Sequence, residues 1–273
     1  MARKKRSRWI DGAVIGLVAA VALVALLAAL PNRDAEPTES TEATEANEPP
    51  KNAYRSEAFY REDGVLRYAD AAHMVGIDVS VHQGVIDWPA VADSGVEFAI
   101  LRVGYRGSTV GELYEDEQFR ENLRGAREAG LKVGAYFFSQ ARDEAEAREE
   151  AEYACELLGA EVLELPLYYD WEVVSGDSRV THPAEVDMTA CAAAFCETVE
   201  AAGHEAGVYF NQTYGYDYLD LGALAEYHLW LAEYNETPSF AYHFDCLQYS
   251  DRGEVAGIGG AVDMDLLIVS EGT

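Results

Sequence analysis

Four acidic residues stand at or near the ends of short apolar segments. They are Asp78 in VGIDVS (75–80), Asp170 and Glu172 in LYYDWE (167–172), and Asp263 in AVDM (261–264). If these segments are β-strands of one sheet or barrel, the four carboxyl groups converge at one rim. Acid-assisted cleavage of a glycosidic bond needs such a group of carboxyls. One of them must hold a proton for the leaving oxygen, while another stays ionised to support the cationic transition state.

The pair Asp170 and Glu172 carries most of this hypothesis. Side chains at positions i and i+2 of a strand share a face, with Cα atoms about 6.7 Å apart, so Trp171 points the other way. Two carboxyls on one face repel when both are ionised, which raises the pKa of one of them. In an acidic chain this pattern is more often a solvated strand edge. Here it follows the apolar run 165–169, which favours a buried strand. The spacing does not separate a retaining from an inverting pair.

Aromatic residues are frequent in the strand-like segments. The chain has 17 Tyr and 4 Trp. Aromatic faces stack on the apolar faces of sugar rings, and tyrosine adds a hydroxyl, so they are candidate substrate contacts as well as candidate core residues. The candidates are Tyr136, Phe138, Tyr209, Trp230 and Tyr234.

The elements that must position these residues alternate between strand and helix. Apolar runs predict eight strands, at 75–80, 98–105, 132–139, 165–172, 206–211, 228–234, 244–250 and 262–267. Helices are predicted at 116–129, where apolar residues stand at helical spacing, and at 143–158 and 185–202; Gly130 and Gly203 close two of them. Residues 88–94 are predicted to form a short helix or a turn. Helical patterns become weak after residue 204. We therefore expect an α/β fold: one irregular (β/α) barrel with fewer than eight helices, whose acids lie at the C-terminal rim.

The N-terminal part of the chain predicts a membrane anchor. Five basic residues lie in the first ten, and residues 12–30 carry no charge, which gives roughly 28 Å of helix. The basic flank favours a cytoplasmic start and an extracellular remainder. A cleaved signal peptide with a secreted product is the alternative. The predicted parts are a basic tail (1–11), a transmembrane helix (12–30), a disordered acidic linker (31–51), a hairpin extension around Asp63-Gly64 (52–72) and the barrel (73–273).

Composition excludes several other classes of function. The formal net charge is −29, and it becomes −34 without the five basic residues near the N-terminus, which argues against nucleic-acid binding. No serine elbow or phosphate-binding loop is present. A metal site made of the four acids stays an alternative, although carboxylate-only sites favour Mg²⁺ or Ca²⁺ and usually follow loop patterns that are absent here. The cysteines show no metal-ligand spacing, so they are small buried residues or, for Cys155, half of a cross-helix disulfide. They are Cys155, Cys191, Cys196 and Cys246.

From about residue 57 onward, the chain resembles the glycoside hydrolase family 25 lysozymes, the N-acetylmuramidases of the Chalaropsis type. The resemblance rests on seven stretches in a matching order. They are GIDVSVHQ (76–83) with IDW (86–88), FAILRVGY (98–105), AGLKVGAYFF (129–138), LPLYYDWE (165–172), GVYFN (207–211), LWLAEYN (229–235), and QYS (248–250) with GIGGAVDMD (257–265). Leu247 and Asp265 depart from the family pattern, which commonly has Trp and Asn at these positions.

This resemblance implies a barrel that cleaves the β-1,4 bond between N-acetylmuramic acid and N-acetylglucosamine in peptidoglycan. It implies that Glu172 is the general acid, that Asp78 and Asp170 orient or stabilise around it, and that Asp263 lines the same floor. Family members are thought to retain configuration, with help from the N-acetyl group of the substrate. Asn211 and Gln248 lie in the matching stretches and join the expected substrate contacts.

The resemblance implies no metal and no cofactor, and we expect a monomer. Two other functions compete with this one. A non-catalytic peptidoglycan-binding scaffold is disfavoured because all four acids are present. A chitinase would need aspartates at Leu165 and Tyr168.

Overall fold

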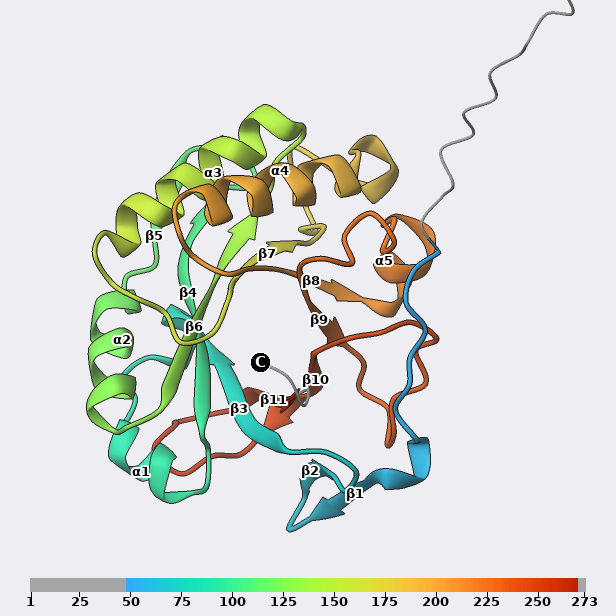
Figure 1. The fold of residues 1–273 in the computed structure, drawn as a ribbon. Helices are drawn as coiled ribbons and strands as arrows, with labels where there is room; N and C mark the ends of the chain where they lie inside the picture. The colour runs from blue at the N-terminus through green and yellow to red at the C-terminus, as the bar shows by residue number, and fades with distance from the viewer. Residues whose placement is uncertain (1–47, 270–273) are drawn as a thin grey trace, which may run out of the picture. The chain divides into compact units, whose positions relative to one another are not determined.

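The computed structural model describes residues 48–269, and a closed barrel forms its centre (Figure 1). Around the barrel the strand order is β3-β11-β10-β9-β8-β7-β6-β4, and β4 pairs with β3 to close the ring. All eight predicted strands are confirmed, with small shifts at their ends. They are β3 (His73–Val79), β4 (Phe98–Arg106), β6 (Lys132–Ser139), β7 (Leu167–Trp171), β8 (Ala206–Asn211), β9 (His228–Ala232), β10 (Cys246–Gly253) and β11 (Val262–Ile268).

Strand β11 departs from the uniform βα alternation of the prediction. It pairs antiparallel with β3 and with β10, while the other barrel pairs are parallel. The connection between β10 and β11 spans residues 254–261, and a parallel arrangement would need a longer crossover. As a result, the start of β11 lies at the rim where the parallel strands end.

Helices cover only part of the barrel wall. In Figure 1, α2, α3 and α4 lie outside strands β4, β6, β7 and β8, and no helix of residues 48–269 covers the outer side of β10 and β11. Residues 48–269 hold five α-helices, so the expectation of fewer than eight is confirmed within this range. They are α1 (Trp88–Asp93), α2 (Phe119–Glu128), α3 (Glu144–Leu158), α4 (Met188–Ala201) and α5 (Gln212–Asp217). Short 3₁₀ turns occur at Ser56–Ala58, Val81–Gln83 and Pro183–Glu185.

Aspartate side chains set where several helices begin. Asp87, Asp143 and Asp187 each accept a hydrogen bond from a backbone N–H in the first turn of α1, α3 and α4. Gly130 and Gly203 follow α2 and α4 with φ of 84° and 93°, so the predicted glycine ends are confirmed.

Helix α2 begins three residues later than predicted, because Asp116 binds Arg102 and the backbone of Val81 instead of entering the helix. Its buried carboxylate accepts hydrogen bonds from Arg102 Nε (2.7 Å) and from the backbone N–H of Val81 (3.0 Å). Just before it lies β5 (Leu113–Glu115), a short strand antiparallel to β4 that the sequence pattern did not predict.

The core has two layers, one inside the barrel and one between the barrel and the helices. The inner layer is rich in aromatic residues, and its fully packed members are Phe98, Ile100, Tyr136, Tyr168, Trp230 and Cys246. The outer layer is larger and includes Trp171 together with the apolar faces of α2, α3 and α4. Gly76 on β3 directly faces the Phe98 ring, so a methyl group at this position would overlap the ring.

The N-terminal extension packs onto the same barrel. Strands β1 (Phe59–Glu62) and β2 (Val65–Tyr68) form the predicted hairpin, in which Asp63 and Gly64 both have positive φ, as a two-residue turn of type I′ requires. Upstream, Lys51 pairs with Tyr242, and Pro50 accepts a hydrogen bond from His243 N–H. These two contacts tie residues 50 and 51 to the segment 242–243, and the predicted linker boundary at residue 51 stays a prediction.

The predicted membrane span at 12–30 lies outside the described residues and stays a prediction. Among residues 48–269, no helix combines the length and the apolar character needed to cross a bilayer.

The contact between Gly76 and Phe98 gives a stability prediction. Gly76→Ala should lower the free energy of unfolding by about 1–3 kcal/mol, because overpacking inside a filled barrel forces side chains off their preferred rotamers. Gly259→Ala is the matched control, since an added methyl group meets no atom there, and we expect a change within about 0.5 kcal/mol. Urea denaturation measures both. Equal urea midpoints for Gly76→Ala and the wild type would contradict the prediction and show that the barrel interior accommodates the extra methyl group.

Candidate active site

A cavity of about 1000 Å³ opens at the rim where the parallel strands end. All four predicted acids line it: Asp78, Asp170, Glu172 and Asp263. The structure thus brings together residues that lie up to 185 positions apart in the chain. The convergence predicted from the strand ends is found.

The register of the strands explains how the acids meet. Asp263 is the direct partner of Asp78 across the antiparallel β11–β3 pair, which is why an aspartate at the start of a strand reaches this rim. Asp170 pairs with positions on β6 and β8, and Glu172 follows the last residue of β7. Trp171 lies between these two acids and packs in the outer layer, as the alternation predicts.

Burial dominates the electrostatics of this rim. It raises the pKa of Asp78 well above its usual range, and the neighbouring Asp265 and Asp263 add to the effect. Burial, followed by the charge of Glu172, does the same to the pKa of Asp170, while Arg102 acts in the opposite direction. These carboxyls cannot all ionise together at low cost, so the cavity retains protons at a pH where isolated carboxyls would lose them.

Glu172 and Asp263 form the more open part of the group. Burial and the charge of Asp263 raise the pKa of Glu172. Burial and Asp251 raise the pKa of Asp263 to about 6. Glu172 is half-buried at the mouth of the cavity, where a proton on its carboxyl can reach a bound molecule.

Gln248 fixes the orientation of Asp78. Its Nε2 donates to Asp78 Oδ2 at 2.7 Å, and its Oε1 accepts from the hydroxyls of Tyr234 (2.7 Å) and Tyr209 (3.2 Å). Because both tyrosines donate to the oxygen, the amide nitrogen must face Asp78. Three predicted contact residues and one predicted acid therefore belong to one hydrogen-bonded chain.

Asp265 adds a fifth carboxyl below the rim. It lies two positions beyond Asp263 on β11 and is fully buried. Its Oδ1 accepts a hydrogen bond from Trp230 Nε1 at 2.9 Å, and its Oδ2 has no hydrogen-bond partner among the described residues. Burial raises its pKa well above the usual range, against the effect of the Trp230 bond. The sequence had marked this position only as a departure from the family pattern.

The predicted substrate contacts divide into two groups. Six of them line the cavity: Tyr136, Phe138, Tyr209, Trp230, Tyr234 and Gln248. Of these, Tyr234 is half exposed, while Trp230 is fully packed in the barrel interior. Asn211 does not line the cavity. Its side chain accepts a hydrogen bond from Tyr214 N–H and caps α5, because asparagine is a favoured N-cap residue.

Sequence reasoning missed one wall of the cavity, formed by Arg102, Tyr105 and Tyr114 together with the loop 107–110. The Arg102 guanidinium lies 5.2 Å from the centre of the Tyr105 ring, which stacks on Tyr114 with centroids 5.2 Å apart. A register shift between Arg102 and Gly104 accompanies this arrangement. Two of these residues stood in the matching stretch 98–105, but a bulge that re-aims a side chain leaves no sequence pattern.

The four cysteines are free thiols in the structure. Cys191, Cys196 and Cys246 are buried, and Cys155 is half-buried. The interpretation as small buried residues therefore holds, and Cys155 has no disulfide partner among the described residues.

A scan against protein families finds one match that spans most of the barrel. Residues 77–258 match the model of glycosyl hydrolases family 25. The chain belongs to this family. Proteins named as lysozymes are among the relatives of this chain.

Named relatives give the extent of the similarity. The autolytic lysozyme of Clostridium acetobutylicum is 32% identical over 193 residues, which cover 70% of this chain and 55% of the relative. The chain thus matches about half the length of that relative. A bacterial lysozyme from Streptomyces coelicolor matches with 26% identity and a TM-score of 0.58, over 74% of this chain and 95% of that one.

A third relative shares the fold. The autolysin LytC of Streptococcus pneumoniae, solved in complex with a synthetic peptidoglycan ligand, matches with 23% identity and a TM-score of 0.61. The match covers 77% of this chain and 52% of that one.

The buried pair Asp78 and Asp265 gives a titration prediction. Asp265→Asn keeps an acceptor for Trp230 but removes an ionisable neighbour of Asp78, so the pKa of Asp78 should fall toward its usual range. Carboxyl ¹³C NMR across pH measures the midpoint, assigned with Asp78→Asn. The exposed Asp217→Asn is the control and should leave the Asp78 midpoint unchanged. An unaltered Asp78 midpoint in Asp265→Asn would contradict this coupling.

Proposed function

We propose that the protein is a peptidoglycan hydrolase, an N-acetylmuramidase of the Chalaropsis type. It cleaves the β-1,4 bond between N-acetylmuramic acid and N-acetylglucosamine, with Glu172 as the general acid. The observation that carries the proposal is the half-buried Glu172 carboxyl, whose pKa is raised, beside Asp170 and Asp263 in one cavity. Membership in glycosyl hydrolase family 25 supports it.

The geometry supports a division of work between the acids. Glu172 holds a proton at the mouth of the cavity and gives it to the leaving glycosidic oxygen. Asp170 lies deeper on the same face of β7, and the two coupled carboxyls share one proton. When Glu172 holds that proton, Asp170 carries the negative charge that stabilises the positive charge developing on the sugar. Water then adds at the sugar carbon, and its proton returns to Glu172. Asp78, fixed by Gln248, keeps the floor of the cavity polar and ordered.

The cavity wall supports a glycan as the substrate. Tyr209, Tyr234 and Phe138 line the same cavity as the acids and offer aromatic faces, and the two tyrosines add hydroxyls. LytC, which has the same fold, was solved with a synthetic peptidoglycan ligand, and this supports the same class of substrate here.

Replacement of the acid tests the proposal. Glu172→Gln keeps the size of the side chain but cannot release a proton, so hydrolysis of purified peptidoglycan should fall by on the order of 10²–10⁴-fold. Pelleting with insoluble wall should stay at the wild-type level. The exposed Glu226→Gln is the matched control and should retain full activity.

Mass spectrometry of the digest identifies the bond, since a muramidase leaves N-acetylmuramic acid at the reducing end. Reducing N-acetylglucosamine ends would overturn the bond assignment. A wild-type protein that binds the wall without cutting it would favour the non-catalytic scaffold.

We also propose that residues 12–30 anchor the protein in the cell membrane with the barrel outside. The uncharged run and its basic flank support this proposal, and a secreted form is the alternative. Membrane fractions of intact cells should contain the protein, and external protease should remove the barrel. A soluble product that begins shortly after residue 30 would show that the segment is a cleaved signal.

A further inference from the structure

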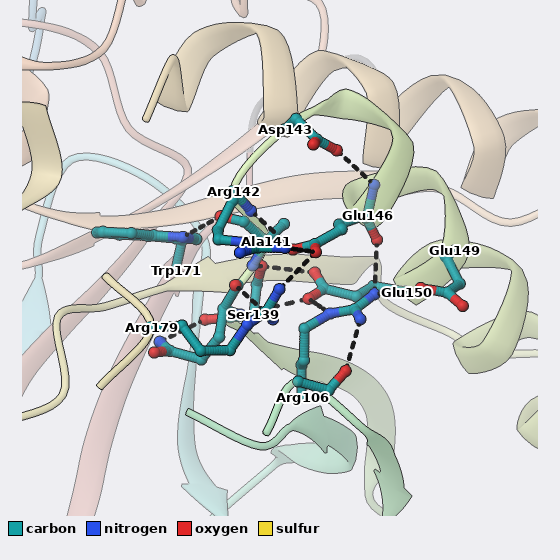
Figure 2. Close-up of polar contacts among 12 residues, drawn as sticks. Arg106, Ser139, Ala141, Arg142, Asp143, Glu146, Glu149, Glu150, Trp171 and Arg179 are labelled. Atoms are coloured by element: carbon teal, nitrogen blue, oxygen red, sulfur yellow. Dashed lines mark hydrogen bonds and ion pairs between the residues drawn. The ribbon is translucent and has the colours of Figure 1, made fainter. Parts of the chain in front are cut away.

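A buried polar cluster lies behind the candidate active site, between the ends of β4 and β6 and helix α3 (Figure 2). Its centre is the ion pair of Arg106 and Glu150, with Nε and Oε1 2.7 Å apart and exposed fractions of 4% and 0%. A pair this deep costs desolvation energy, and replacing such a pair with apolar residues is often neutral or stabilising. The role of the Arg106–Glu150 pair therefore lies in the residues that it holds in place.

Glu150 holds the segment 139–141 that follows β6. Its Oε2 accepts a hydrogen bond from the Ser139 hydroxyl at 2.5 Å, and its Oε1 accepts from the backbone N–H of Gln140 at 3.3 Å. The Ser139 hydroxyl oxygen in turn accepts from Ala141 N–H at 3.1 Å. Three consecutive residues are thus tied, directly or through one hydroxyl, to one buried carboxylate.

The segment 139–141 in turn holds the two residues at the end of β7. Trp171 Nε1 donates to the carbonyl of Ala141 at 2.9 Å, as Figure 2 shows. Gln140 Nε2 donates to the carbonyl of Glu172 at 2.6 Å and to that of Ser139 at 2.8 Å. The β6–β7 ladder ends at the pair of Ser139 and Trp171. Beyond that pair, the Gln140 side-chain amide donates the hydrogen bond that a neighbouring strand would otherwise give to the Glu172 carbonyl.

The orientation of the Gln140 amide is fixed by its surroundings. Both groups next to its nitrogen are carbonyl oxygens, which only accept, so a flipped amide would set oxygen against oxygen. Its Oε1 is buried and has no hydrogen-bond partner among the described residues. An unpaired buried acceptor costs free energy, and this cost is offset by the two hydrogen bonds that the Gln140 nitrogen donates.

We propose that Gln140, held by the buried Arg106–Glu150 pair, is a positioning residue that fixes the backbone of Glu172 and so the direction of its carboxyl. This inference rests on the proposed role of Glu172 as the acid. A general acid must lie within hydrogen-bond reach of the oxygen that it protonates, and small displacements cost large factors in rate. Glu172 has left the sheet, so the Gln140 bond replaces a strand neighbour at that carbonyl.

A purely structural cluster and a positioning cluster differ in one observable, the titration of Glu172. Its pKa is raised by burial and by Asp263. If Gln140 holds the carboxyl in that place, releasing it admits water and lowers the Glu172 pKa. A loss of stability elsewhere reduces the folded fraction and leaves the pKa as it was. The titratable groups that face this carboxyl are Asp170, Asp263, Tyr209, Tyr214 and Tyr234.

The experiment uses Gln140→Met in the full chain, because methionine keeps the length of the side chain and removes both donors. Carboxyl ¹³C NMR reads the Glu172 pKa without any need for activity. We expect a lower Glu172 pKa, a loss of about 10- to 100-fold in kcat and a nearly unchanged KM on peptidoglycan fragments. The alkaline limb of the activity profile should move to lower pH by the same amount.

Two further variants make the test decisive. Gly125→Ala is a destabilised control in the outer layer, because its added methyl group would overlap the Trp88 ring between α1 and α2. It should leave the Glu172 pKa and the pH profile unchanged. Ser139→Ala loosens the segment without touching Gln140, and it should shift the Glu172 pKa in the same direction by less. A Glu172 pKa in Gln140→Met equal to that of the wild type overturns the inference. A wild type that cleaves no glycan refutes the proposed function, and the NMR result still decides whether Gln140 positions Glu172.

Discussion

Strand β11 runs against both of its neighbours, and the candidate site depends on this reversal. A parallel strand at this place would carry its first residues to the far end of the barrel. Because β11 enters from the rim, Asp263 lies opposite Asp78, and Asp265 follows two positions deeper in the barrel. The last strand also closes the ring between β10 and β3. The same strand thus closes the barrel and completes the cluster of carboxyl groups.

The buried carboxyls of the cavity are stabilised mainly by uncharged hydrogen-bond donors. Gln248 and Trp230 donate hydrogen bonds to the buried carboxyls Asp78 and Asp265. Among the described residues that line the cavity, the arginines are Arg102 and Arg106, and each is already paired with a buried acid. A carboxyl that meets an amide rather than a cation keeps a raised pKa, so the cavity holds protons at a pH where isolated carboxyls have lost them. In the proposal above, the buried cluster behind the rim sets the direction of the half-buried Glu172 carboxyl.

The sequence predicted much of this arrangement, for physical reasons. Eight apolar runs, the Asp-Gly turn and the four acids each have a local pattern that does not depend on the rest of the chain. The direction of β11, the bulge near Arg102 and the capping role of Asn211 depend on distant partners, so the local pattern does not contain them. Asp116 and Glu150 were hidden among 49 acidic residues, because burial distinguishes them and composition does not.

The pairing of the first and last barrel strands has a consequence for folding. His73 on β3 pairs with Ile268 on β11, and the Tyr54 hydroxyl donates to the carbonyl of Phe244 across 190 positions. Such distant contacts carry a large loop-closure entropy and slow the final folding step. In a nascent chain that has not yet added β11, the barrel is open and Asp78 has no Asp263 opposite it. The complete carboxyl cluster therefore forms only after β11 has been added, and no fragment that ends before β11 can form it.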